Sequence, residues 1–219
     1  MFRVLLRLRK GEQVRYIGHL DLMRSFEHAI RRAHVPVVYS SGFNPRPKMH
    51  FGGALGVGVT SEDEWVVLDL TESVPAAEIM ARLNEVLPAG IQVLGAEDLP
   101  EGVKSPLSKL NAAVYRITLR CPEELDGRAA QRVLDEMLSA AEVKVMRQRN
   151  EEKEVDIRPH ILGIEIEECS DGKLALTAAL TAGSSGGGRP QDLIEALIER
   201  LPGLGVENIH KIRSRGVED

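Results

Sequence analysis

Hydrophobic and polar positions alternate at the start of the chain and then change period. Residues 2–9 alternate, which predicts a strand with one largely polar face. Over residues 21–33 the apolar positions recur every three or four residues, which predicts an amphipathic helix with Asp21 as its N-cap. Pro36 forbids continuation of this helix, and residues 37–40 favour a second strand.

The pattern then repeats in a second βαβ unit. A loop with two prolines at 41–48 and a glycine-rich stretch at 50–59 precede a clear strand at 65–70. Ser73 is expected to cap a helix that runs to about residue 87, and another strand begins at residue 91. The order β-α-β, β-α-β is that of a ferredoxin-like split-βαβ fold.

The same order of elements returns after residues 98–110, which hold two prolines and one glycine and predict a linker. The later elements are strands at 114–119, 143–147, 161–166, 174–180 and 209–213, and helices at 123–140 and from Pro190 onward. We therefore expect an α+β protein of two tandem ferredoxin-like halves with antiparallel sheets. Their expected bounds are 1–100 and 111–219, and the second half carries an extra strand.

Charge is distributed unevenly along the 219 residues. The first 60 residues hold ten Lys and Arg against three Asp and Glu, a balance of +7, although the whole chain has a net charge of −5. A basic segment on an otherwise acidic protein indicates a local anionic partner.

Composition excludes several classes of protein. Cys121 and Cys169 lie in no CxxC or Cys/His cluster, so we expect free buried thiols in a reducing compartment and neither a metal site nor a cofactor. No run of 18 apolar residues predicts a membrane span, and the alternating N-terminus is unlike a signal peptide, so a cytoplasmic location is expected. The chain has no HExxH, GxSxG or kinase signature, so the usual enzyme classes are not supported.

The first segment with candidate chemistry lies at the predicted strand-to-helix junction. Its residues of interest are Arg15, His19, Asp21 and Arg24. Free backbone N–H groups at a helix start attract anions, and a histidine there can bind phosphate or shuttle a proton. The alternative is that His19 packs and Asp21 only caps the helix.

The second segment is the loop that follows the predicted helix. It contains Tyr39, Ser40, Phe43, Asn44, Arg46, Lys48 and His50. Asn and Arg can hydrogen-bond to base edges, Phe can stack on a base, and Lys can contact phosphate, while the prolines stiffen the loop. The alternative is a structural loop with Phe43 tucked into the core.

Two further segments are less specific. Residues 147–160 contain Arg147 and Arg158 among mixed charges, which fits a solvated hairpin or a second phosphate-binding arm. Residues 183–190 form a glycine-rich turn with Arg189 before a helix, which fits a generic anion site or a plain connection.

The stretch HLDLMRSFEHAIRRAHVPVVYSSGFNPRPKMHFGGALGVGV, with EVDIRPHI and GGGRPQDLIEAL, resembles a bacterial family, the radical-SAM-linked domain of unknown function. The resemblance spans nearly the whole chain. Its motif residues here are His19, Asp21, Ser40, Gly42, Phe43, Asn44, Pro45, Lys48, Arg158, Pro159, Arg189 and Pro190. The glycine-rich stretch has more glycines and fewer cations than the family pattern, which weakens phosphate binding there.

The resemblance also implies partners. Members of that family occur alone or fused behind a cobalamin-binding radical SAM protein, and their genes often lie beside one for a ribonuclease of the E/G type. This implies work on RNA or the ribosome next to a radical SAM enzyme, with this chain as the non-radical partner because it lacks cluster-binding cysteines.

Three functions therefore compete. The favoured one is a non-catalytic RNA-binding or substrate-presenting partner of a radical SAM enzyme. The alternatives are a protein-interaction module without RNA binding, and a metal-independent RNA-processing enzyme. In the enzyme, His19 or His50 would act as general acid or base and Lys48 would steady the phosphate.

Overall fold

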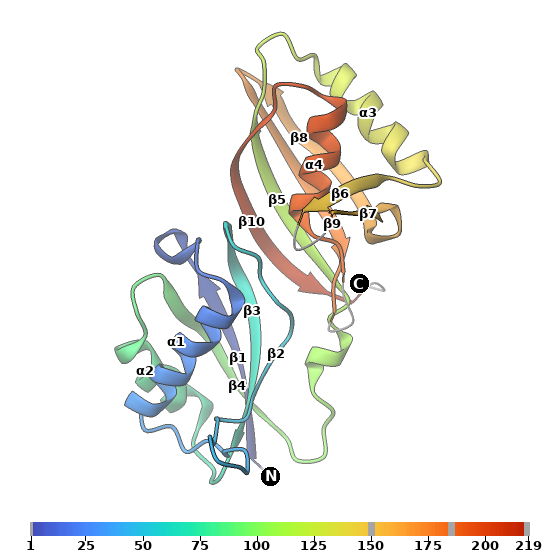
Figure 1. Cartoon of the computed structure of the whole chain (residues 1–219). Helices are drawn as coiled ribbons and strands as arrows, with labels where there is room; N and C mark the ends of the chain where they lie inside the picture. Colours follow the sequence, from blue (N-terminus) through green and yellow to red (C-terminus); the bar gives the residue numbers. More distant parts are fainter. Residues whose placement is uncertain (1, 149–151, 184–186, 217–219) are drawn as a thin grey trace. The chain divides into compact units, whose positions relative to one another are not determined.

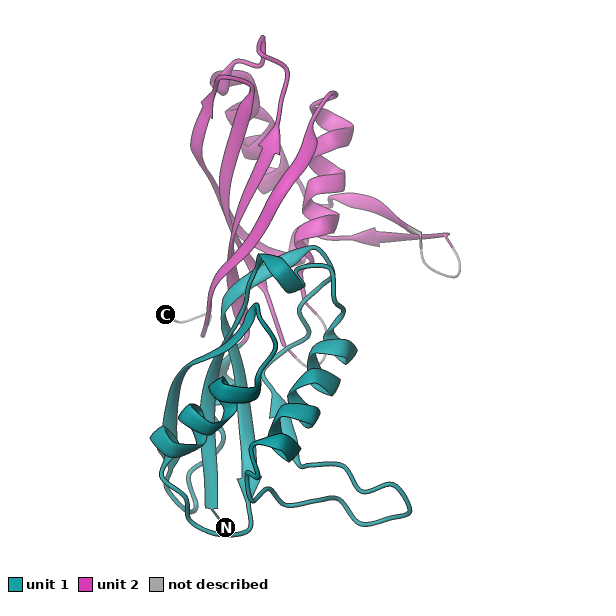
Figure 2. Ribbon diagram, turned by 90° about the vertical axis from the view of Figure 1, so that its left-hand side faces the viewer, with its two compact units in different colours: residues 1–110 teal, residues 111–219 magenta. Residues whose placement is uncertain are grey.

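The computed structural model describes residues 2–148, 152–183 and 187–216. It divides the chain into two compact units, residues 1–110 and 111–219 (Figure 2). The protein is of the mixed α+β class, with mainly antiparallel strands and four α-helices in its described residues (Figure 1).

Unit 1 is a four-stranded antiparallel sheet with two helices on one face (Figure 1). Its elements are β1 (Phe2–Lys10), α1 (His19–Arg32), β2 (Met49–Phe51), β3 (Val59–Leu70), α2 (Ala76–Val86) and β4 (Ile91–Leu99), with short 3-10 helices at Glu12–Val14 and Pro106–Lys109. The strands lie in the order β4-β1-β3-β2, and each neighbouring pair is antiparallel.

The core of unit 1 follows from the two periodicities in the sequence. Val4, Leu6 and Leu8 of β1 point to the helix side and are buried, whereas Arg7 is exposed. The apolar stripe of α1 packs onto them through Phe26, Ala29 and Ile30, and Leu22 of the same helix is also buried. Each fully buried Leu or Phe contributes about 1.5–3 kcal/mol to folding, so this stripe determines which way α1 faces.

Three expectations for unit 1 are wrong in detail. Gly18 is the N-cap of α1, so Asp21 lies inside the first turn and does not cap the helix. Ser73 does not cap α2, which begins after Pro75, because the residue before a proline is disfavoured in a helix. Residues 37–40 form two isolated bridges, Val37 to Leu70 and Tyr39 to Pro47, and not a strand.

Unit 2 repeats this architecture and adds a hairpin. Its elements are β5 (Ala112–Arg120), α3 (Gly127–Ser139), β6 (Lys144–Gln148), β7 (Glu152–Asp156), β8 (Ile161–Ser170), β9 (Lys173–Thr181), α4 (Pro190–Arg200) and β10 (Gly205–Arg215), with a 3-10 helix at Arg158–His160. The sheet order is β10-β5-β9-β8, all antiparallel, and β6 pairs with β7 in a separate two-stranded sheet.

Helix α3 is shorter than the expected 123–140. Asp126 caps it, because its carboxylate accepts a hydrogen bond from the backbone N–H of Arg128 at 3.1 Å. Residues 123–126 therefore belong to the preceding turn. In α4 the predicted start at Pro190 is confirmed.

Candidate nucleic-acid interface

A buried lysine organises the start of α1. Lys10, at the end of β1, is 1% exposed. Its ammonium donates hydrogen bonds to the backbone carbonyls of Arg15 at 3.0 Å, Ile17 at 2.9 Å and Gly56 at 3.4 Å. Burial lowers the pKa of Lys10, and the nearby Glu64 carboxylate acts in the opposite direction. Lys10 thus ties the loop before α1 to the loop before β3.

His19 is the first residue of α1 and is half-buried. Its ring meets that of Phe51 edge-on, with centroids 5.3 Å apart at 88°. Its Nδ1 atom is buried and has no hydrogen-bond partner among the described residues. Burial lowers the pKa of His19, Glu64 raises it and Lys10 lowers it further, so the imidazole is neutral at neutral pH.

Apolar side chains surround this helix start and remain exposed. Tyr16, Leu20 and Val57 have 72%, 67% and 56% of their surface exposed. The guanidinium of Arg15 lies over the Tyr16 ring, 5.1 Å from its centre. We call Tyr16, Leu20 and Val57 the apolar rim, and exposed apolar side chains that gather in this way are typical of contact surfaces.

Two cations of the first segment already have carboxylate partners. Arg15 pairs with Glu12 at 3.1 Å, and Arg24 pairs with Asp21 at 3.2 Å. Both pairs are partly or fully solvent-exposed, so an incoming anion would compete with a weak interaction. The expected roles of Arg15, Asp21 and Arg24 in anion binding remain predictions.

Residues 38–48 form a long loop of unit 1, which we call the arm (Figures 1 and 2). The backbone N–H of Ser40 donates to the Arg46 carbonyl at 2.8 Å, and that of Lys48 donates to the Val38 carbonyl at 2.7 Å. The Ser40 hydroxyl also accepts from the Arg46 N–H at 3.0 Å. Gly42 turns the chain with a φ of 130°, a conformation that favours glycine. These bonds therefore hold residues 38–40 and 46–48 of the arm together before any ligand arrives.

The tip of the arm presents the side chains that the sequence singled out. Phe43 is fully exposed at 106%, so the alternative that it packs in the core is wrong. Asn44, Arg46 and Lys48 are also exposed, and Tyr39 is 41% exposed. The arm thus carries a ring, an amide and two cations on a supported backbone.

The arm and α1 lie on neighbouring parts of unit 1. The Arg46 guanidinium is 3.9 Å from the Glu27 carboxylate of α1, and its side chain is still 72% exposed. Phe51, just after the arm, contacts both His19 and Phe26 of α1, the latter with ring centroids 6.2 Å apart. The arm therefore lies beside α1, and the strand that follows it contacts His19.

His50 does not share a site with His19. Phe51 points to the helix side of the sheet, and successive side chains of a strand point to opposite faces, so His50 points to the other side. There its Nε2 atom is 3.7 Å from an oxygen of Asp69. The two histidines are thus on opposite faces of β2.

In unit 2 the predicted arginines have partners within the protein. Arg158 donates from Nε to the Leu138 carbonyl and from Nη1 to the Ile161 carbonyl, each at 3.0 Å. These bonds join the end of α3 to the start of β8, so they explain the position of the Arg158 side chain without a bound anion. Its predicted role in anion binding thereby loses support.

Sequence reasoning missed Asp192, a buried carboxylate in the first turn of α4. Nε of Arg147 lies 3.0 Å from one of its oxygens, and Nε of Arg189 lies 3.8 Å from the other. The ion pair with Arg147 fastens the β6–β7 hairpin to α4. The hairpin expected around residues 147–160 is confirmed by the pairing of β6 with β7. Residues 149–151 and 184–186, which belong to the two less specific segments, lie outside the described residues.

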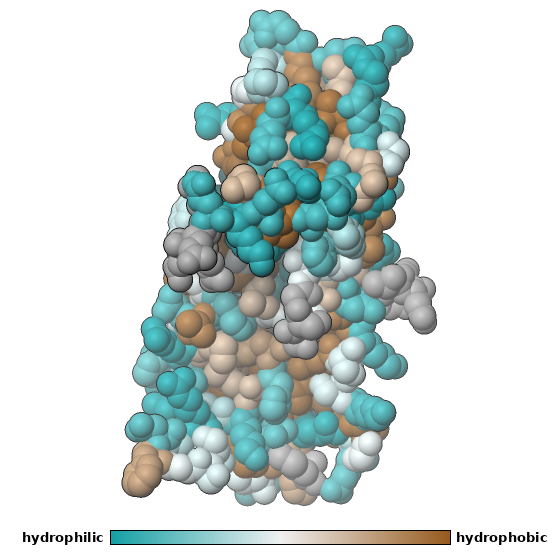
Figure 3. Space-filling view, turned by 45° about the vertical axis from the view of Figure 1, so that its right-hand side comes forward, coloured by the Kyte–Doolittle hydropathy of each residue, from teal (hydrophilic) through white to brown (hydrophobic). Residues whose placement is uncertain are grey.

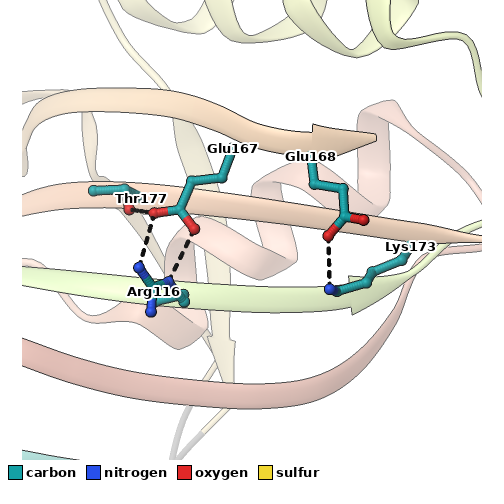
Figure 4. A network of polar contacts seen from close by, with 5 residues as sticks. All are labelled: Arg116, Glu167, Glu168, Lys173 and Thr177. Atoms are coloured by element: carbon teal, nitrogen blue, oxygen red, sulfur yellow. Dashed lines mark hydrogen bonds and ion pairs between the residues drawn. The ribbon is translucent and has the colours of Figure 1, made fainter. Parts of the chain in front are cut away.

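On the sheet of unit 2, basic and acidic side chains of neighbouring strands pair with one another (Figure 4). Arg116 of β5 donates to Glu167 of β8 at 2.9 Å, and the Thr177 hydroxyl of β9 donates to the same carboxylate. The Thr177 hydroxyl first, and then Arg116, hold the pKa of Glu167 below its usual value. Lys173 pairs with Glu168 at 2.7 Å. Little free positive charge is left on this part of the sheet.

The two cysteines are free and half-buried. Burial is the main cause that raises the pKa of each thiol, and the neighbouring Cys169 raises that of Cys121 further. Within the described residues, no group of three or more His, Cys, Asp or Glu side chains is placed to hold a metal ion. No helix in that same part of the chain is long and apolar enough to cross a membrane.

Apolar side chains also reach the surface between hydrophilic ones elsewhere, as the face in Figure 3 shows. Exposed apolar area by itself therefore does not distinguish the apolar rim. What distinguishes it is its place beside the buried Lys10 and His19 at the start of α1.

Comparison with known proteins gives one family and a fold-level likeness. The family described as "Uncharacterized protein conserved in bacteria (DUF2344)" matches residues 3–190. A 3-methyl-2-oxobutanoate hydroxymethyltransferase of Caldivirga maquilingensis is 30% identical over 105 residues, which is 48% of this chain and 38% of that protein.

Two solved structures are similar over most of the chain. A Cbf5-Nop10-Gar1 complex aligns with 96% of this chain and 48% of its own, at a TM-score of 0.56 and 12% identity. An H/ACA RNP bound to a substrate RNA aligns with 96% of this chain and 47% of its own, at a TM-score of 0.54 and 13% identity. This chain thus spans about half the length of these structures, and at such identity the likeness shows the fold alone.

Proposed function

This chain belongs to the bacterial family of uncharacterized proteins that matches residues 3–190, and from its own residues we propose that it is a non-catalytic RNA-binding protein. In this proposal it holds RNA for a radical SAM enzyme that acts on RNA or the ribosome. The radical SAM partner is carried over from the resemblance of the sequence motifs.

We further propose that each unit is a ferredoxin-like half. In unit 1 the strand order β4-β1-β3-β2 is fourth, first, third, second, with helices after the first and third strands. In unit 2 the order β10-β5-β9-β8 is the same once the β6–β7 hairpin is treated as an insertion.

The observation that carries the RNA proposal is the supported arm of residues 38–48. A fully exposed phenylalanine leaves its apolar surface in water, which is unfavourable unless a ligand covers it. Asn44, Arg46 and Lys48 beside it supply hydrogen bonds and positive charge, the combination that stacks on a base and contacts its phosphate. The backbone bonds of the arm reduce the entropy lost on binding.

A catalytic role receives less support from the geometry. A metal-independent nuclease of the kind considered above needs an acid or base beside the cation that steadies the phosphate. His19 lies on the helix side of the sheet and His50 on the other, so they do not form an acid–base pair. The neutral His19 could still act alone, and RNA cleavage lost in His19→Ala would support the enzyme.

The apolar rim favours a second candidate function, a docking surface for a protein partner. Tyr16, Leu20 and Val57 are apolar and exposed at one place, and RNA has less need of such a surface than a protein does. The two candidates are compatible, because the arm and the rim occupy different parts of unit 1.

Binding of a single-stranded RNA by the full chain tests the proposal, measured by fluorescence anisotropy over a range of salt concentrations. Affinity should fall steeply with salt. Phe43→Ala should weaken binding by about 1–3 kcal/mol without changing the salt slope, whereas Lys48→Ala should also reduce the slope by about 0.7.

Lys104→Ala is the matched control, since Lys104 is an exposed lysine of unit 1 outside the arm. Equal losses in Lys48→Ala and Lys104→Ala would show that only overall charge matters. Absence of binding at low salt would refute the RNA proposal and leave the protein-docking candidate.

A further inference from the structure

Helix α1 carries a second cationic feature, toward its C-terminal end. An open hollow of about 380 Å³ is lined by Ser25, His28, Arg31, Arg32 and Pro88. We propose that this hollow binds a phosphate group, and that it holds a backbone phosphate of the RNA whose bases meet the arm. The RNA part of this inference rests on the proposed function.

Basic side chains line up along the helix toward the hollow because of their spacing in the sequence. Arg24, His28 and Arg31 follow one another at intervals of four and three residues, so they share one exposed face of α1. From Arg24 to Arg31 this face extends for about 10 Å at 1.5 Å per residue. The hollow lies at its C-terminal part, where a polyanion following the helix would arrive.

One arginine is already fixed in position at the edge of the hollow. Nη2 of Arg32 donates to the carbonyl of Val86, the last residue of α2. A guanidinium has five N–H donors, so the remaining ones are available to a ligand. Holding the side chain in place beforehand reduces the entropy lost when an anion binds.

The hollow has positive charge without carboxylates in its lining. The two acids of α1 lie elsewhere, since Asp21 pairs with Arg24 and Glu27 approaches Arg46. Within the described part of the chain, Arg31 makes no ion pair. Arginines in a last turn also stabilise the helix dipole, but that role requires neither a hollow nor the His28 side chain one turn earlier.

The hollow is close to the arm along α1. Glu27, which Arg46 of the arm approaches, directly precedes His28. An RNA strand whose bases stack on the arm can therefore place a neighbouring phosphate at α1. A phosphate, with several acceptor oxygens, matches guanidinium donors better than a single carbonyl would.

Two measurements on the full-length protein test this site. In the first, inorganic phosphate is titrated into ¹⁵N-labelled protein, and the backbone amide signals of residues 25–32 should shift and saturate. The double variant His28→Ala with Arg31→Gln should lose these shifts, while Arg82→Gln, a change at a partly exposed arginine of α2, should keep them. Unsaturable shifts, or shifts that persist in the double variant, would overturn the inference.

The second measurement is the RNA titration with the same variants. Arg31→Gln should weaken RNA binding about fivefold and reduce the salt slope by about 0.7, as the loss of one phosphate contact requires. If Phe43→Ala weakens binding but Arg31→Gln does not, the RNA function stands and the RNA part of this inference fails. If no RNA binds but phosphate saturates the hollow, the proposed function fails and the site is one for a free phosphate compound.

Discussion

Replacing Lys10 with methionine should destabilise unit 1 and loosen the start of α1. Methionine keeps the apolar stem of the side chain but removes the ammonium that binds three backbone carbonyls. Two of these carbonyls belong to the loop before α1 and the third to the loop before β3. The variant therefore tests whether the buried charge holds the two loops together.

The expected cost is about 3 kcal/mol. A buried carbonyl left without a donor costs about 1–3 kcal/mol, and those of Arg15 and Ile17 are on half-buried residues, whereas Gly56 is exposed and can bind water. Glu64, which is 2% exposed, also loses a nearby positive charge. The variant also no longer buries an ammonium group, which is favourable and opposes these losses. The total cost is therefore expected near the lower end of the range that the two carbonyls give.

Urea denaturation followed by the fluorescence of Trp65 measures this cost directly. Trp65 is the only tryptophan of the chain and lies in β3 of unit 1, so its signal reports that unit. A loss of about 3 kcal/mol should lower the urea midpoint by about 1–3 M, because m values of small proteins in urea are about 1–3 kcal/mol per M. Lys48→Met, at an exposed lysine, is the matched control and should stay within about 0.5 kcal/mol of wild type.

A loss below about 1 kcal/mol in Lys10→Met would refute this reasoning. It would mean that water replaces the ammonium at all three carbonyls, or that burial of the charge costs as much as its bonds contribute. An equal loss in Lys48→Met would show instead that removing a positive charge is what matters.

Three further predictions concern titration and ion pairing. Asp192→Asn should lower the free energy of unfolding by about 2–3 kcal/mol, because Arg147 and Arg189 both lose a buried carboxylate partner. Hydrogen exchange of the β6–β7 hairpin should then accelerate, and unchanged exchange would contradict this prediction. Arg116→Ala should raise the pKa of Glu167 in an NMR titration, while the Thr177 hydroxyl keeps that pKa below its usual range. Because folding lowers this pKa, the Glu167 carboxylate stabilises the folded protein above the ordinary pKa of Glu. This stabilisation is lost as the pH falls through the pKa of Glu167 in the folded protein. His19→Phe should reduce the loss of stability that occurs as the pH falls below about 6.5. Burial lowers the pKa of His19 in the folded protein, so the unfolded chain takes up this proton at a higher pH than the folded protein does. An unchanged pH profile of stability would show that other groups cause the loss.

The parts of the fold that the sequence predicts are those with a long, regular apolar pattern. Strand β1 and helix α1 each bury one side. Their sequences show this directly, as alternating apolar residues in the strand and as an apolar stripe in the helix. The start of α1 was displaced because Gly18 gives no side-chain capping signal while Asp21 does. For strand β7 the sequence left a hairpin and a phosphate-binding arm open, because its residues EKEVD are mostly charged and show no apolar pattern of a strand.

The exposure of the candidate loop residues could be predicted from the sequence, whereas the buried polar contacts around them could not. Exposed loop residues such as Phe43 and Lys48 could be chosen from residue type and prolines, since loops lie at the surface. The burial of Lys10 could not, because its acceptors come from two loops that are about 40 positions apart. Asp192 was missed for the same reason: an acid in a first helical turn is common, and only the fold brings the Arg147 side chain to it.

The position of the last strand in each unit has a consequence for biosynthesis. β4 pairs with β1, so that Arg3 lies opposite Leu99, and β10 pairs with β5, so that Ala112 lies opposite Arg215. Contacts between residues so distant in sequence raise the contact order and slow folding. Each sheet therefore has to wait for its final strand to leave the ribosome, and until then the long edge of β1 or β5 is open to wrong pairing. A truncation or stalled chain that ends before β4 or β10 should need a chaperone, although it already contains both helices of its unit.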